Sequence, residues 1–204
     1  KENHTSVSKW FDTLGIFETL LSFAVVHFNH PSWTFPVLKV EHFYIEAYDM
    51  GHPLIAESKR VNNFIKIEQK ASIMLVTGSN MAGKSTYLRS IGINVVLAMA
   101  GCPVCARSFT LTPVLLLSSM RIADNLEEST STFYAELKKL KTIIDKVNNK
   151  EKVFILLDEI LRGTNSIDRH TGSKAFIKQL IKQQAAAIIA THDTDLAAMQ
   201  HDYP

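Results

Sequence analysis

Three nearly continuous apolar runs occur along the chain, at residues 72–76 (SIMLV), 153–157 (VFILL) and 185–190 (AAAIIA). Short runs without alternating polar positions are typical of strands buried on both faces of a parallel sheet. Segments with helical periodicity lie between them, and residues 113–119 (PVLLLSS) are a candidate for a further strand. The pattern therefore predicts an α/β fold with a mostly parallel central sheet flanked by helices.

The first part of the chain has a different pattern, because residues 8–30 carry apolar side chains at helical spacing and predict a helix whose apolar stripe needs a packing partner. These positions are Trp10, Phe11, Leu14, Phe17, Leu21 and Ala24. Two prolines in the following HPSWTFP segment interrupt regular structure. We therefore expect an N-terminal helical segment over residues 1–34 and a separate domain over residues 35–204. Residues 37–48 mix β-branched, aromatic and charged residues, as expected for an exposed or edge strand.

The N-terminal helix contains Asp12 and Glu18, which interrupt its apolar stretch. A membrane span needs about 20 predominantly apolar residues, so we expect no membrane contact in this region. The sequence has no signal-peptide pattern, and it starts at Lys1 without a methionine, which we interpret as part of a longer protein. With few cysteines and no export signal, the expected location is cytoplasmic.

Composition fits one globular domain, or one domain with a short appendage, because the 204 residues are 46% hydrophobic and 21% charged. The formal net charge is only +2, so no strong basic field indicates nucleic-acid binding by this part of the chain. Cys102 and Cys105 form one C-x-x-C pair, which is compatible with a redox pair or half of a zinc site. No second pair completes four ligands, so we predict two buried, small hydrophobic side chains.

Residues 78–85, GSNMAGKS, carry the first motif that indicates a specific function. They match the pattern G-x-x-x-x-G-K-[ST] and lie between a predicted strand and a predicted helix. In this pattern, backbone N–H groups of a tight loop and a helix N-terminus surround phosphate oxygens. Lys84 brings a charge to the β- and γ-phosphates of ATP, and Ser85 offers an oxygen to Mg²⁺. A glycine-rich turn without a ligand is the alternative. The predicted nucleotide-binding residues are Gly78, Ser79, Asn80, Met81, Ala82, Gly83, Lys84, Ser85 and Thr86.

Polar residues also follow the other two buried runs, and parallel strands bring such carboxyl ends to one edge of the sheet. Asp158 and Glu159 follow the second run, where Asp158 is expected to share Mg²⁺ with Ser85 and Glu159 to orient the attacking water. Thr191 and His192 follow the third run, where His192 is expected to sense the γ-phosphate or the water. The catalytic prediction is thus Glu159, Lys84 and His192. A solvated acidic turn and a structural histidine remain the alternatives.

A fourth segment, residues 131–147, predicts an amphipathic helix with serine and threonine at its start. Its apolar stripe consists of Phe133, Leu137, Leu140, Ile144 and Val147. By itself, this pattern indicates no more than a capped helix that packs on a core.

Together these segments resemble the ATPase domain of the MutS mismatch-repair proteins over residues 51–196. TGSNMAGKSTYLRS is similar to the family's T-G-x-N-M-x-G-K-S-T-Y-x-R motif, and LLDEILRGTNSIDRH to its D-E-x-x-R-G-T stretch, with Asp168 at a matching acidic position. STSTFYAEL resembles the S-T-F-x-x-E segment, while GHPLI and VNNF are similar to the H-P motif and the adenine-side loop. Leu161 stands where the family often has glycine, and ESTST replaces a more usual S-G-R.

The resemblance implies a P-loop NTPase of the ABC type that binds and hydrolyses ATP with Mg²⁺. It also implies a homodimer with composite sites, in which Ser131 and Thr132 at a helix start contact the partner's nucleotide. A helix N-terminus suits this role because its free N–H groups favour anions. DNA would be contacted through regions outside residues 1–204, and nucleotide state would control the dimer and its DNA clamp.

Other functions remain open beside this one. The chain could be a nucleotide-responsive scaffold, or a divergent MutS-like protein that does not act in mismatch repair. A transporter nucleotide-binding subunit would need an L-S-G-G-Q-like segment, which the sequence lacks. A P-loop kinase would need an acceptor site, for which no motif is visible.

Overall fold

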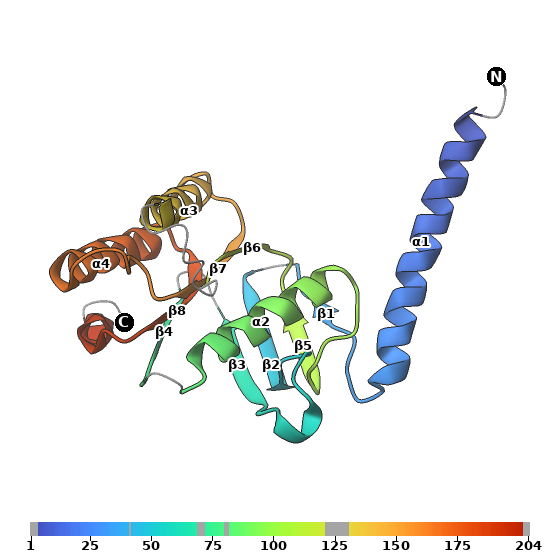
Figure 1. Ribbon diagram of the computed structural model, residues 1–204, viewed down its shortest axis with the longest axis horizontal. Coiled ribbons are helices and arrows are strands. Elements are labelled where there is room, and N and C mark those ends of the chain that lie inside the picture. Colours follow the sequence, from blue (N-terminus) through green and yellow to red (C-terminus); the bar gives the residue numbers. More distant parts are fainter. Residues whose placement is uncertain (1–3, 41, 69–71, 80–81, 121–130, 202–204) are drawn as a thin grey trace.

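The computed structural model describes residues 4–40, 42–68, 72–79, 82–120 and 131–201. Their central feature is a four-stranded, all-parallel sheet in the order β4-β8-β7-β6 (Figure 1). The strands are β4 (Ile73–Thr77), β6 (Leu115–Ser119), β7 (Val153–Asp158) and β8 (Ala186–Thr191). Every residue of β7 and β8 is buried, as their continuous apolar runs require. The predicted α/β class and all four predicted strands of this sheet are confirmed.

A second, mixed sheet has the order β1-β5-β2-β3. It consists of β1 (Val37–Leu38), β2 (Tyr44–Met50), β3 (Asn63–Glu68) and β5 (Ser108–Leu111). The prediction of an edge strand over residues 37–48 is right only for β1, which is exposed. It is wrong for β2, which pairs on both sides with β3 and β5 and buries Ile45 and Ala47. The charged residues of β2 are not buried, because Glu46 is half-buried and Asp49 is exposed.

Helix α2 (Lys84–Met99) packs between the two sheets. Its Leu88, Ile91 and Val95 share a core with β2 and β3 on one side and with Phe154 and Leu156 of β7 on the other. Helices α3 (Ser131–Asn148) and α4 (Ser166–Lys182) cover the opposite face of the parallel sheet. Short 3₁₀ helices occupy Glu57–Lys59 (η1) and Thr194–His201 (η2). The predicted helix over 131–147 is confirmed, with Leu140 and Val147 buried.

Helix α1 (His4–Asn29) extends away from the rest of the molecule (Figure 1). The predicted helix is therefore confirmed, but its apolar residues, among them Trp10, Phe11, Phe17 and Phe28, stay exposed. By length and composition alone, Ser6–Asn29 is long and apolar enough to cross a membrane, although Asp12 and Glu18 lie within it. Core helices and signal sequences have the same property, so this finding places no part of the protein in a membrane.

The two cysteines are free and buried, as predicted. Burial raises the pKa of both thiols. Within the described ranges, no three His, Cys, Asp or Glu side chains form a group that could hold a metal by themselves. Cys102 and Cys105 thus act as small core residues beside α2.

Candidate functional site

The carboxyl ends of β4, β8 and β7 lie side by side and bring the three predicted polar segments together. Thr77 at the end of β4 pairs with Thr191 at the end of β8, and Asp158 at the end of β7 pairs with Ala190. The loop after β4, the acidic pair after β7 and the histidine after β8 therefore share one edge of the sheet. The sequence predicted this meeting of the three segments from their positions after buried strands.

The loop between β4 and α2 makes a tight turn into the helix. Gly83 adopts a left-handed conformation with φ of 82°, which favours glycine, and the helix starts at the next residue. The first N–H groups of a helix lack partners inside it, so Lys84, Ser85 and Thr86 offer donors to an anion. Ser85 is half-buried and Thr86 is exposed. Gly78, Ser79 and Ala82 belong to the same loop, whereas Asn80 and Met81 lie outside the described residues.

The Lys84 ammonium lies inside this loop. Its Nζ donates to the carbonyl oxygens of Gly78 at 2.6 Å and Ser79 at 2.9 Å. The same Nζ is 3.4 Å from Nδ1 of His192, and the residue as a whole is buried. These contacts fix a positive charge at the centre of the loop, where predicted phosphate oxygens would lie.

Asp158 is the buried last residue of β7. Its Oδ2 is fully buried and has no hydrogen-bond partner among the described residues. A buried carboxylate oxygen without a partner is costly, and a divalent cation is one group that would satisfy it. Carboxylate and hydroxyl oxygens are ligands that Mg²⁺ accepts, so Asp158 and Ser85 fit the predicted metal role chemically. That role stays a prediction.

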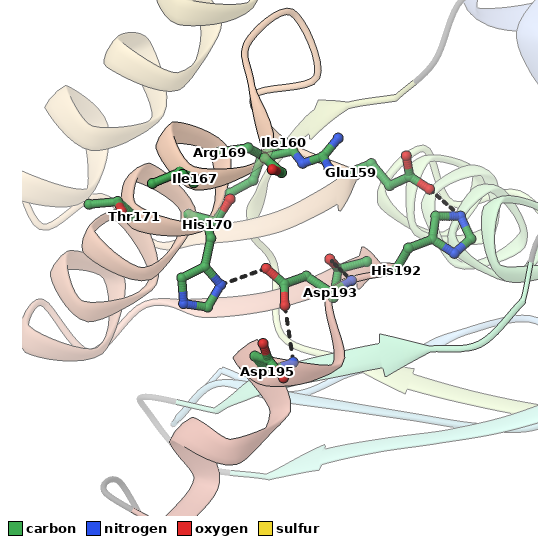
Figure 2. Close-up of a pocket in the computed structure, with 12 residues that line it drawn as sticks. Glu159, Ile160, Ile167, Arg169, His170, Thr171, His192, Asp193 and Asp195 are labelled. Carbon is green, nitrogen blue, oxygen red and sulfur yellow. Dashed lines mark hydrogen bonds and ion pairs between the residues drawn. The ribbon is translucent and has the colours of Figure 1, made fainter.

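The side chain of Glu159 points toward the imidazole of His192 (Figure 2). Its Oε1 contacts Nε2 of His192 at 2.5 Å, and its Oε2 accepts from Nη2 of Arg162 at 2.6 Å. Because His192 also meets Lys84 through Nδ1, one imidazole connects the cation to the carboxylate. This network matches the tautomer with the proton on Nε2, which donates to Glu159 while Nδ1 accepts from Lys84.

Sequence reasoning gave no role to Arg162, although its spacing of three residues from Glu159 is a detectable signal. It also missed a second pair beside the site, in which Nδ1 of His170 on α4 lies 2.7 Å from Oδ2 of Asp193 after β8 (Figure 2). The backbone N–H of Asp195 donates to Oδ1 of Asp193, and the N–H of Asp193 donates to Thr191 Oγ1. The pair therefore ties the loop that carries His192 to α4.

The pKa of Asp193 lies below its ordinary value of 3.8. Burial alone would raise this pKa, but hydrogen bonds from His170 and from the backbone N–H groups of Asp195 and Leu196 lower it, and the lowering dominates. Stabilisation of the charged carboxylate by donors explains that direction.

Two cavities border the site. One of about 470 Å³ lies beside Glu159, His192 and the His170–Asp193 pair. The other, of about 530 Å³, extends from Gly83 and Lys84 to His52, Val61 and Phe64. The second cavity thus brings the GHPLI and VNNF segments beside the loop, where their family resemblance implies an adenine-side contact. Burial lowers the pKa of His52, which favours a neutral imidazole there.

The predicted trans residues mark the start of α3, which begins at Ser131. The structure describes the backbone of Ser131 and Thr132 but not their side chains, so their contact with a partner stays a prediction. Asp168 has a local task, because its N–H donates to Asn165 Oδ1 at 2.9 Å and its Oδ2 accepts from Asn165 Nδ2 at 2.7 Å. This reciprocal arrangement caps the start of α4.

Fold and site together define a mixed α/β domain whose charged and polar site residues gather at the carboxyl edge of a parallel sheet. Residues 74–204 match the family model of MutS domain V, and the chain belongs to that family.

Several relatives are similar over most of this chain. They include DNA mismatch repair protein MSH4 of Arabidopsis thaliana, 35% identical over 78% of the chain, and DNA mismatch repair protein MSH3 of Candida albicans, 30% identical over 99%. DNA mismatch repair protein MutS of Thermotoga petrophila is 29% identical over the whole chain. The chain spans 20% of the first two relatives and 25% of the third.

Proposed function

We propose that this chain is an Mg²⁺-dependent ATP-hydrolysing domain of the P-loop type in a MutS-like mismatch-repair protein. The observation that carries the proposal is the connected set Lys84–His192–Glu159 at the sheet edge, next to the buried oxygen of Asp158, which has no hydrogen-bond partner in the described part of the chain. The Lys84 ammonium, the Glu159 carboxylate and an Asp158 oxygen that could bind a cation lie at the same edge of the sheet. This combination suits phosphoryl transfer to water, which depends on positioning and charge stabilisation.

In this function, the loop N–H groups and Lys84 bind the terminal phosphates. Ser85 and Asp158 would hold Mg²⁺, which when bound supplies positive charge against the γ-phosphate oxygens. Glu159 orients the attacking water and accepts its proton, and His192 keeps the Glu159 carboxylate aligned with Lys84. The cavity between Gly83 and Phe64 would take the base of the nucleotide.

Family membership extends the proposal to the parent protein. The relatives named above are DNA mismatch repair proteins. We therefore propose that the parent protein is a homodimer with composite ATP sites, and that hydrolysis at these sites controls how regions outside these residues bind DNA. Ser131 and Thr132 would complete the partner's site from the N-terminus of α3.

A second candidate is a nucleotide-responsive scaffold that binds ATP without turnover. One observation favours it: both Glu159 oxygens are occupied, by His192 and by Arg162, and these contacts compete with water for the carboxylate. Hydrolysis then requires a water to reach one of the remaining acceptor sites of this carboxylate.

Two measurements on the full chain separate these functions. Calorimetry with Mg²⁺ and a slowly cleaved ATP analogue is expected to show saturable binding, and its absence on folded protein would refute both candidates. Phosphate release from ATP is expected with wild-type protein. Saturable binding without any phosphate release would leave only the scaffold.

A further inference from the structure

We infer that Glu136 is a positioning residue for Glu159, an inference that rests on the proposed hydrolysis. Glu136 lies on α3, 25 positions before Leu161, which is part of the turn that follows β7. Its Oε1 accepts a hydrogen bond from the backbone N–H of Leu161 at 2.6 Å. This contact joins the helix that begins at Ser131 directly to the turn that carries the proposed water-positioning carboxylate.

The turn needs such support because its backbone is strained. Glu159 has φ of 53° and Leu161 has φ of 58°, and neither residue is a glycine. Left-handed backbone at residues with a side chain persists where the surroundings hold it. At Leu161, the family resemblance pointed to glycine, so this chain carries at that position a strain that glycine would not have.

Two further contacts hold the same turn. A Cβ on Gly172 of α4 would lie 2.5 Å from Cδ1 of Leu161, so the leucine side chain sits directly against that helix. A Cβ on Gly163 would lie 2.7 Å from Cβ of Phe133, so α3 and the turn are in close contact at a second point. Leu161 itself is only 9% exposed. Side-chain packing thus fixes the position of the turn, and Glu136 binds the backbone N–H that sets its conformation.

As a consequence, the N-terminus of α3 is connected through Glu136 to the turn that carries Glu159. Ser131 and Thr132 are the proposed trans contacts, and Glu136 follows them by little more than one helical turn. A displacement of the α3 start therefore shifts the acceptor of the Leu161 N–H and, through the turn, the Glu159 carboxylate. Nucleotide contact in one protomer would in this way be transmitted to the water-positioning group of the other.

The test compares Glu136→Ala, which removes the acceptor, with Glu136→Gln, which keeps a carbonyl oxygen at the same place. Asp145→Ala, an exposed acidic position on the same helix, is the matched control. We expect Glu136→Ala to lower kcat for phosphate release about ten- to a hundredfold, as small misplacements of a reacting group do, without weakening analogue binding. Glu136→Gln and Asp145→Ala should keep wild-type kcat.

Rescue by the conservative variant is the readout that a merely structural role for the charge or size of Glu136 would not move. Wild-type kcat in Glu136→Ala, or a loss in Glu136→Gln equal to that in Glu136→Ala, would overturn the inference.

Amide hydrogen exchange tests the same contact without relying on catalysis. Exchange of the Leu161 N–H should be about tenfold faster in Glu136→Ala than in wild type or Glu136→Gln, because only the alanine variant lacks an oxygen that accepts the hydrogen bond. Unchanged exchange would overturn the inference even if kcat falls. If wild-type protein releases no phosphate, the proposed hydrolysis fails, whereas the exchange result still decides whether Glu136 holds the turn.

Discussion

The imidazole of His192 contacts the carboxylate of Glu159 through Nε2, at 2.5 Å, across the ends of two neighbouring parallel strands. Each residue directly follows one of the paired strands β7 and β8, and the backbone N–H of Glu159 donates to the carbonyl oxygen of Ala190, so the sheet register brings the two segments together. It aligns one carboxylate oxygen at the edge where the Lys84 ammonium also lies.

The first prediction concerns Glu159→Gln. The amide keeps the size of the side chain but cannot accept a proton from water, so kcat should fall by about 10²–10⁴-fold while analogue affinity stays near that of wild type. Phosphate-release kinetics and calorimetry measure the two quantities. Glu18→Gln, at an exposed position on α1, is the control. Turnover in Glu159→Gln comparable to that of wild type would remove Glu159 from the proposed role.

The second prediction concerns Lys84→Ala. This change removes the charge at the centre of the loop and the hydrogen bonds to Gly78 and Ser79. A hydrogen bond to a charged group contributes about 1.5–3 kcal/mol, so analogue affinity should fall about ten- to a hundredfold in calorimetry. Lys178→Ala, exposed on α4, should bind as wild type does. Equal affinity in both variants would exclude Lys84 from phosphate binding.

The parallel sheet could be predicted from sequence because β7 and β8 bury both faces, and this leaves an uninterrupted apolar run in the chain. The meeting of Asp158 and His192 followed from the same pattern. The second sheet could not be predicted in this way. Its strands β2 and β3 interleave charges such as Glu46 and Lys66 with apolar residues, so neither leaves a continuous apolar run. The partners of β2 lie 13 to 24 positions away in β3 and 60 to 66 positions away in β5.

The contacts that join α3 and α4 to the loops of the site could not be predicted from the sequence either. Glu136 and Leu161 are 25 positions apart, and His170 and Asp193 are 23 apart, so no local periodicity relates them. Their pairing depends on how α3 and α4 lie on one face of the sheet. The leucine at position 161 does not itself indicate the left-handed backbone that it adopts, and the only hint was the glycine that the resembled family often has there.

The third prediction concerns stability and uses a pair of glycines. In Gly163→Ala, the new Cβ would lie 2.7 Å from Cβ of Phe133, an atom held close to the α3 backbone. Overpacking of this kind costs about 1–3 kcal/mol, so the midpoint of urea unfolding should fall. Gly15→Ala, in α1, meets nothing within 4 Å and should not lower it. An unchanged midpoint in Gly163→Ala would mean that α3 and the turn after β7 are not in close contact.

The fourth prediction concerns pH and the His170–Asp193 pair. Since the pKa of Asp193 is lowered in the folded protein, its charged form stabilises the fold above the ordinary value of 3.8, and this contribution is lost as pH falls through the lower folded pKa. His170→Ala removes a donor that lowers the pKa, so the Asp193 pKa should rise and acid unfolding should begin at a higher pH. His170→Gln keeps a neutral donor, so the pKa of Asp193 in this variant should lie between its values in wild type and in His170→Ala.

NMR titration of the Asp193 carboxyl carbon measures the shift, with His27→Ala on α1 as the control for loss of a histidine. An Asp193 pKa that is identical in wild type and His170→Ala would show that the backbone N–H groups alone lower it, and that His170 does not tie the His192 loop to α4 through charge.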